Sequence, residues 1–148
     1  NKNKVSFPAF NGENDCDLCV IGGGFTGLST AIEAAKKNAE TMGHKNGTFI
    51  EGTTEEHIQD LVDAYDPSQT AVILDPPRKG CHSSILEVLI QAKPKQIIYV
   101  SCHPATLSRD IKTLCESGYF EVHQVIPLDM FPQTQHVECV TDIRLKQS

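Results

Sequence analysis

The 148-residue chain is predicted to form an α/β domain with a mostly parallel sheet, because short apolar runs alternate with amphipathic stretches from residue 17 onward. The clearest run, residues 71–74, ends at an aspartate and two prolines, as a central parallel strand does when it meets a loop. Glycine-rich or reactive residues follow other such runs, where open α/β sheets bind ligands. These patterns predict one domain over residues 17–148, preceded by a loosely ordered lead-in over residues 1–16.

The expected elements follow in chain order. Strands are expected at residues 18–21, 48–51, 71–74 and 96–100, with a closing antiparallel pair at 121–127 and 137–145. Helices are expected at residues 26–42, 54–64, 84–92 and 104–116. Gly43 is expected to end the first helix, Thr54 to cap the second, and Pro104 to open the fourth.

Composition and charge narrow the class of protein. The net charge of −6 is not that of a basic nucleic-acid-binding protein, so any nucleic acid would be met by local pairs such as Arg78 with Lys79. No run reaches the roughly 18 apolar residues of a membrane span, and the first residues lack a secretory signal. Scattered cysteines indicate free thiols in a reducing compartment. We therefore expect an intracellular protein, of the cytoplasm or nucleus, with no membrane partner.

Three motifs carry candidate chemistry. Residues 75–80 read DPPRKG, in which two prolines hold the Asp75 carboxylate at a strand end, although an acidic turn would look the same. Cys102 lies between a strand and a helix whose first turn contains Pro104, and the positive end of that helix favours a thiolate, although many such cysteines are inert. His136 and Glu138 are two residues apart, where a loop enters the last expected strand, and are possible acid/base groups or simply polar residues of a loop entering an edge strand.

Together these motifs resemble one family. The strings ILDPPRKG (73–80), YVSCHPATLSRD (99–110) and DMFPQTQHVE (129–138) are similar, in order and spacing, to those of the RNA 5-methyluridine methyltransferases. The resemblance covers residues 71–140 and implies transfer of a methyl group from S-adenosylmethionine to carbon 5 of uridine in RNA, with tRNA as the expected substrate. It implies a Rossmann-like class I methyltransferase domain, here lacking one βα unit.

The resemblance also assigns roles to individual residues. Cys102 would be the nucleophile that adds to carbon 6 of uracil, and Glu138 the base that removes the carbon 5 proton. Asp75 and Arg78 would bind the substrate, with Asp75 also near the cofactor. The family usually has asparagine where His103 stands. Adenine-N6 methyltransferases also place two prolines after an acidic or amide residue, but an aromatic residue follows there, and they need no cysteine nucleophile.

The front half gives a different indication. Gly22, Gly24 and Gly27 form a Gly-x-Gly-x-x-Gly turn that can admit a cofactor, and residues 17–29 look like the start of a flavin-dependent oxidoreductase. Glu51 stands where a ribose-binding carboxylate is expected. These four are the expected cofactor-binding residues, together with Asp75. The alternative function is therefore a catalytically silent or FAD- or NAD-binding module.

Residues 31–52 nevertheless look like methyltransferase sequence, joined to the glycine turn without the usual intervening helix and strand. The N-terminal portion common in the family, which often includes an RNA-binding barrel, is missing, so a fragment, a truncated isoform and a mispredicted gene product all remain open. Cys16 and Cys19 have no second ligand pair at zinc spacing, and no metal is expected. The sequence does not indicate an oligomeric state.

Overall fold

The computed structural model describes residues 17–22, 28–43, 47–130, 132–134 and 137–147. The expected lead-in over residues 1–16 lies outside these ranges. In chain order the elements are β1 (Asp17–Gly22), α1 (Leu28–Thr41), α2 (Thr54–Asp63), the 3-10 turn η1 (Pro67–Gln69), β2 (Thr70–Asp75), α3 (Ser83–Ala92), β3 (Gln96–Ser101), α4 (Pro104–Glu116), β4 (Phe120–Leu128) and β5 (Glu138–Leu145).

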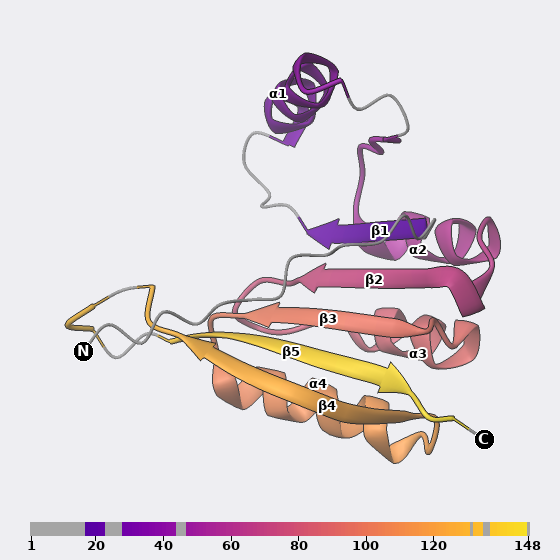
Figure 1. Cartoon of the computed structure of the whole chain (residues 1–148), viewed down its shortest axis with the longest axis vertical. Coiled ribbons are helices and arrows are strands. Elements are labelled where there is room, and N and C mark those ends of the chain that lie inside the picture. The colour runs from indigo at the N-terminus through magenta and orange to yellow at the C-terminus, as the bar shows by residue number, and fades with distance from the viewer. Residues whose placement is uncertain (1–16, 23–27, 44–46, 131, 135–136, 148) are drawn as a thin grey trace.

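The five strands form one sheet in the order β1-β2-β3-β5-β4 (Figure 1). β1, β2 and β3 are parallel to one another, whereas β5 is antiparallel to both β3 and β4. The α/β class is confirmed, and the sheet is mixed, because the expected closing hairpin contributes two antiparallel pairings to match the two parallel ones. Because β1, β2 and β3 run in one direction and β5 runs in the other, the carboxyl ends of β1, β2 and β3 lie at the same edge of the sheet as the start of β5.

The prediction of a strand at residues 48–51 is wrong. Residues 47–53 form no helix or strand, and both Phe49 and Ile50 are exposed. β1 pairs directly with β2 in the described sheet, so no neighbouring strand is recorded that would satisfy the backbone of this segment. α1 lies away from the sheet, beyond β1 (Figure 1). Gly43 follows α1 with a φ of 79°, as expected of a residue that ends a helix.

The cap of α2 lies one residue earlier than predicted. Thr53, not Thr54, has the extended backbone of an N-cap, and its N–H donates to Glu56 Oε2 at 3.0 Å. Glu56 is three residues downstream, which is the spacing of a capping box. This bond holds the pKa of the Glu56 carboxyl below its usual value. The error arose because two adjacent threonines are equivalent in sequence and only the backbone angles distinguish them.

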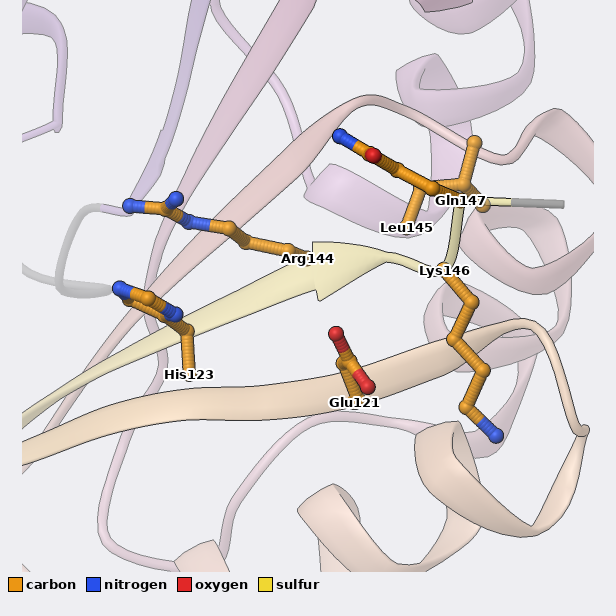
Figure 2. A pocket seen from close by; sticks show the side chains of 6 residues that line it. All are labelled: Glu121, His123, Arg144, Leu145, Lys146 and Gln147. Carbon is orange, nitrogen blue, oxygen red and sulfur yellow. The ribbon is translucent and has the colours of Figure 1, made fainter.

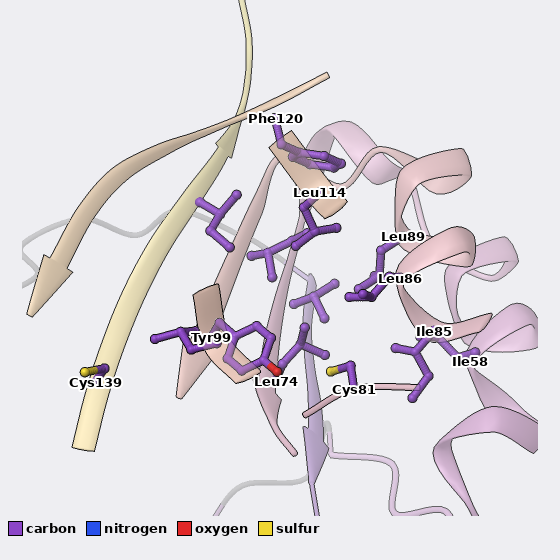
Figure 3. Packing of buried hydrophobic residues seen from close by; sticks show 14 residues of the cluster. Ile58, Leu74, Cys81, Ile85, Leu86, Leu89, Tyr99, Leu114, Phe120 and Cys139 are labelled. Carbon is purple, nitrogen blue, oxygen red and sulfur yellow. The ribbon is translucent and has the colours of Figure 1, made fainter. Parts of the chain in front are cut away.

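Helices α2, α3 and α4 cover one face of the sheet and form the core with it (Figure 3). Their buried side chains include Ile58 of α2, Leu89 of α3 and Leu114 of α4. On the strands, alternate residues point into this core: Thr70, Val72 and Leu74 on β2; Ile97, Tyr99 and Ser101 on β3; Cys139, Thr141 and Ile143 on β5. The residues between them are only half-buried, so they mark the opposite face.

A shallow hollow of about 350 Å³ lies where β4 and β5 meet the C-terminal residues (Figure 2). Its lining includes Glu121 and Arg144, which are partners in the β4–β5 register. Arg144 also pairs with Gln96, the first residue of β3. This hollow therefore lies at the amino edge of the parallel strands, opposite the edge where open α/β sheets bind ligands.

Candidate active site

Three of the four residues predicted to perform the chemistry or bind substrate lie at the ends of neighbouring strands, at one edge of the sheet: Asp75, Cys102 and Glu138. Asp75 ends β2, Cys102 follows the last residue of β3, and Glu138 begins β5. Each is one residue away from a buried, core-facing neighbour: Leu74, Ser101 and Cys139. Because side chains alternate along strands, all three belong to the face opposite the core.

Cys102 and Glu138 lie next to the last recorded pair of β3 and β5. The last recorded pair of these antiparallel strands is Ser101 with Cys139. One step further along the same register is Cys102 with Glu138. Directly opposed residues of an antiparallel pair have Cβ atoms about 4.5–5.5 Å apart. Both side chains are half-buried, so a substrate could reach them from the open face.

A compact turn holds Cys102 between β3 and α4. The N–H of His103 donates to Ser101 Oγ at 3.1 Å, and that hydroxyl is 3.3 Å from the His103 carbonyl oxygen, to which it donates. His103 is the N-cap of α4, and its Nδ1 accepts the N–H of Thr106 at 3.4 Å. A ring nitrogen that accepts must be unprotonated. Histidine here caps the helix as an asparagine would, so the departure from the family pattern leaves this turn capped.

The loop that begins at Asp75 is fastened to α4. Thr106 Oγ1 is 3.0 Å from the carbonyl oxygens of both Arg78 and His103, so its single proton is shared between the two turns. Arg109 Nη2 donates to the Lys79 carbonyl oxygen at 3.0 Å. The predicted substrate residues Asp75 and Arg78 are both exposed. The loop carrying them and the turn carrying Cys102 are thus joined through the first two turns of one helix.

Asp110 is the buried charge behind this arrangement, and sequence reasoning missed it. Only 1% of the residue is exposed, and its carboxylate accepts from the Tyr99 hydroxyl at 2.6 Å and the Cys81 N–H at 2.8 Å. Arg109 also donates to it, from Nε at 2.8 Å. A signal was present: Asp110 lies on the helix face that buries Leu107 and Leu114, where a charged residue is unusual unless paired.

The same network suppresses ionisation of two neighbours. Burial raises the pKa of the Cys81 thiol to about 11. Burial, and donation of its hydroxyl proton to Asp110, raise the pKa of Tyr99. Figure 3 shows the Tyr99 hydroxyl pointing toward Cys81. Cys81 is accordingly a neutral buried thiol on the core side of the sheet, distinct in setting from Cys102 on the open face.

Of the predicted cofactor residues, Gly22 is the best placed. It ends β1 directly beside Asp75 in the parallel register, so both lie at the edge where a nucleotide would bind. Gly24 and Gly27 lie outside the described residues, as do Phe131 and His136. Glu51 is exposed in the segment before α2, where its carbonyl oxygen is 3.1 Å from His57 Nε2. Of the predicted cofactor residues, the structure therefore brings Gly22 and Asp75 side by side.

Two kinds of feature are absent from the described ranges. No helix in them is long and apolar enough to cross a membrane. They also contain no group of three or more His, Cys, Asp or Glu side chains arranged to hold a metal ion. Cys16, one half of the Cys-x-x-Cys pair, is outside those ranges.

Comparison with known sequences agrees with the motifs. The family model for tRNA (uracil-5-)-methyltransferases matches residues 29–146. An RNA methyltransferase of Oceanobacillus iheyensis is 50% identical over 119 residues, which are 80% of this chain and 25% of the relative. One from Clostridium acetobutylicum is 51% identical over 117 residues, 79% of this chain and 25% of the relative. The chain thus spans about a quarter of the length of these curated relatives.

Solved structures give the same fold. The tRNA (uracil-54, C5)-methyltransferase of Pyrococcus abyssi, in complex with S-adenosyl-L-homocysteine, superposes with a TM-score of 0.62 at 26% identity, covering 88% of this chain and 34% of that one. A precorrin-6y C5,15-methyltransferase of Geobacter metallireducens, with a TM-score of 0.53 and 19% identity, covers 86% of this chain and 79% of that one and shares the fold alone. The flavin-binding alternative gains no support from these comparisons.

Proposed function

This chain belongs to the tRNA (uracil-5-)-methyltransferase family, and from that premise we propose that it catalyses methylation of carbon 5 of a uridine in RNA, with tRNA as the substrate. The observation that carries the proposal is that Cys102 follows Ser101 and Glu138 precedes Cys139, and Ser101 and Cys139 are the last recorded pair of β3 and β5. A nucleophile and a base beside that pair can act on adjacent carbons of one ring.

Cys102 would provide covalent activation. Carbon 5 of uracil is too weakly nucleophilic to take a methyl group from a sulfonium directly. Addition of the Cys102 thiolate to carbon 6 forms a carbon–sulfur bond and moves the double-bond electrons toward carbon 5 and the adjacent carbonyl. S-adenosylmethionine supplies the methyl group that carbon 5 then acquires. Cys102 stands two residues before Pro104, the first residue of α4.

Glu138 would complete the cycle. After methylation, carbon 5 carries both a proton and the new methyl group. Removal of that proton by the Glu138 carboxylate restores the double bond, and the Cys102 sulfur leaves carbon 6. Asp75, one strand away on the same face, would orient the uracil or the cofactor by hydrogen bonding, and exposed Arg78 would contact the RNA. The P. abyssi relative, a tRNA methyltransferase bound to S-adenosyl-L-homocysteine, supports both the cofactor and the substrate class.

The test is covalent trapping. The protein is mixed with S-adenosylmethionine and tRNA containing 5-fluorouridine, then run on a denaturing gel. Fluorine in place of the carbon 5 proton blocks the last step, so the enzyme should remain joined to the RNA. We expect a shifted band that disappears in Cys102→Ala. Cys115→Ala is the matched control, because Cys115 is another half-buried free cysteine, at the far end of α4.

Two results would count against the proposal. A shifted band that survives Cys102→Ala but vanishes in Cys115→Ala would show that the nucleophile is Cys115 and not Cys102. Absence of any band, from protein whose circular dichroism shows the folded α/β domain, would remove the covalent mechanism from this chain. Flavin absorbance in the purified protein would instead favour the oxidoreductase-like reading of the glycine turn.

A further inference from the structure

We propose that Asp110 is a positioning residue, which fixes the loop of residues 75–81 against α4 and thereby sets where Asp75 and Arg78 stand relative to Cys102. The inference deepens the proposed function and rests on it for its catalytic consequence. The structural part, that one buried carboxylate on α4 holds this loop, stands on the contacts alone.

The contacts reach the loop from three positions on α4. Asp110 Oδ2 accepts the N–H of Cys81 at 2.8 Å. Arg109, held by Asp110 at 2.7 Å between Nη2 and Oδ1, donates to the Lys79 carbonyl oxygen. One turn earlier, Thr106 Oγ1 lies 3.0 Å from the Arg78 carbonyl oxygen. Three of four consecutive residues at the end of the loop are therefore bound through their backbone, by groups on a single helix.

The loop also leaves no room for a side chain at Gly80. Its φ is 82°, and its N–H closes a turn onto the Pro77 carbonyl oxygen at 2.8 Å. A Cβ built there would lie 2.5 Å from both Asp110 Oδ2 and Arg109 Nη2. The backbone of the loop thus passes directly over the Asp110–Arg109 pair, which is the closest approach that glycine permits.

Asp110 further connects the loop to β3. Its Oδ2 accepts the Tyr99 hydroxyl at 2.6 Å, and Tyr99 is fully buried three residues before Cys102. One carboxylate oxygen therefore accepts a hydrogen bond from the strand that leads to Cys102 and another from the loop that begins at Asp75. A buried carboxylate with three hydrogen-bond donors cannot shift without losing one of these bonds. The loop that carries the candidate substrate-binding residues and the strand that leads to the candidate nucleophile are therefore held in a fixed relation.

The experiment compares Asp110→Asn with Tyr99→Phe in the full chain. Asparagine keeps the shape but loses the charge that holds Arg109, and its amide cannot accept as strongly from Cys81. Tyr99→Phe removes the hydrogen bond from the Tyr99 hydroxyl to Asp110 Oδ2 and leaves the contacts between Asp110 and the loop in place. If Asp110→Asn fails to fold, Thr106→Val takes its place. It removes a half-buried hydroxyl, on the first turn of α4, that contacts the loop. Urea unfolding measures the stability of each variant.

The direct readout is hydrogen exchange at residues 78–81. We expect faster exchange there in Asp110→Asn or Thr106→Val, and little change in Tyr99→Phe at comparable stability. The functional readout is the rate of adduct formation with 5-fluorouridine tRNA at saturating RNA, expected to fall about tenfold to a hundredfold in Asp110→Asn. Alkylation of Cys102 by iodoacetamide should be unchanged, because the nucleophile itself is not altered.

Either of two results would overturn the proposal. One is unchanged exchange at residues 78–81 in folded Asp110→Asn and Thr106→Val. The other is an equal loss of adduct formation in Tyr99→Phe and Asp110→Asn, since that would make the role one of stability alone. If the unsubstituted protein forms no adduct, the proposed function fails, and the exchange measurement still decides whether Asp110 holds the loop.

Discussion

Cys102 and Glu138 come together from positions 36 residues apart because β5 runs antiparallel to β3 and begins where β3 ends. The register makes them neighbours, and strand alternation turns both toward the open face. In the proposed mechanism the two side chains act on adjacent carbons of one ring, Cys102 by forming a bond and Glu138 by removing a proton. Their roles can therefore be separated by substitution, because each acts at a different stage of the cycle.

Glu138→Gln is expected to stop the cycle after the covalent step. The amide has the size of the carboxylate but cannot accept the carbon 5 proton, so turnover should fall by about 10²–10⁴-fold. With ordinary uridine in the tRNA, the methylated adduct should accumulate on a denaturing gel, where the unsubstituted protein shows none. Glu121→Gln is the control, because Glu121 is an exposed glutamate at the other end of the β4–β5 pair. Lost turnover without accumulated adduct would place Glu138 before addition of the thiolate.

At the scale of elements, the loop after β2 and helix α4 behave as one unit, and glycine substitutions test it. Gly80 and Gly118 have nearly the same φ, 82° and 83°, but a Cβ at Gly118 would meet nothing within 4 Å. Gly118→Ala should therefore cost only the left-handed backbone, about 1–2 kcal/mol. Gly80→Ala should cost more than that, because its Cβ would also lie 2.5 Å from Asp110 Oδ2 and Arg109 Nη2. Urea unfolding measures both, and equal losses would mean that the Asp110 contact adds nothing.

The sequence predicted elements best where local pattern and tertiary pairing agree. Residues 71–74 and 96–100 lie within β2 and β3, and Pro104 opens α4 as expected. The segment at residues 48–51 has the composition of a strand but lacks a recorded partner beside β1. Pairing is a property of the whole sheet, so no local pattern could reveal that it is missing.

The candidate site was predictable only in part, for a related reason. The identity of Cys102, Glu138 and Asp75 follows from motif strings, and their assembly on one face follows from strand register. The loop contacts of Asp110 connect residues 29 positions apart in the chain, and such contacts leave no periodic signal. What the sequence did contain was a charged residue on the buried face of a helix, which requires a partner without naming it.

For the molecule as a whole, the described helices α2, α3 and α4 lie on one face of the sheet and the candidate site on the other. The residues that form the core and the residues of the candidate site thus lie on opposite faces of the sheet, with Tyr99 and Cys81 on the core side. Substitutions in the core should act on the site only through the backbone of β2, β3 and the loop that joins α3. This separation allows global stability to be altered by core substitutions that leave the face carrying Cys102 and Glu138 unsubstituted.

Alkaline pH should destabilise the fold through the core-side groups. The pKa of Cys81 is about 11 in the folded protein against an ordinary value of 9.0, so the unfolded chain releases this proton first. As pH rises from 9 to 11 the unfolded state binds fewer protons than the folded state, and the free energy of unfolding falls. A difference of about two pH units corresponds to about 3 kcal/mol. The raised pKa of Tyr99 extends the loss to higher pH. Urea unfolding at pH 8, 9, 10 and 11 measures the slope, which should become shallower in Cys81→Ala, where Tyr99 and Cys115, whose pKa values burial also raises, still contribute. A slope that Cys81→Ala leaves unaltered would show that the thiol does not contribute and that the alkaline loss arises elsewhere in the chain.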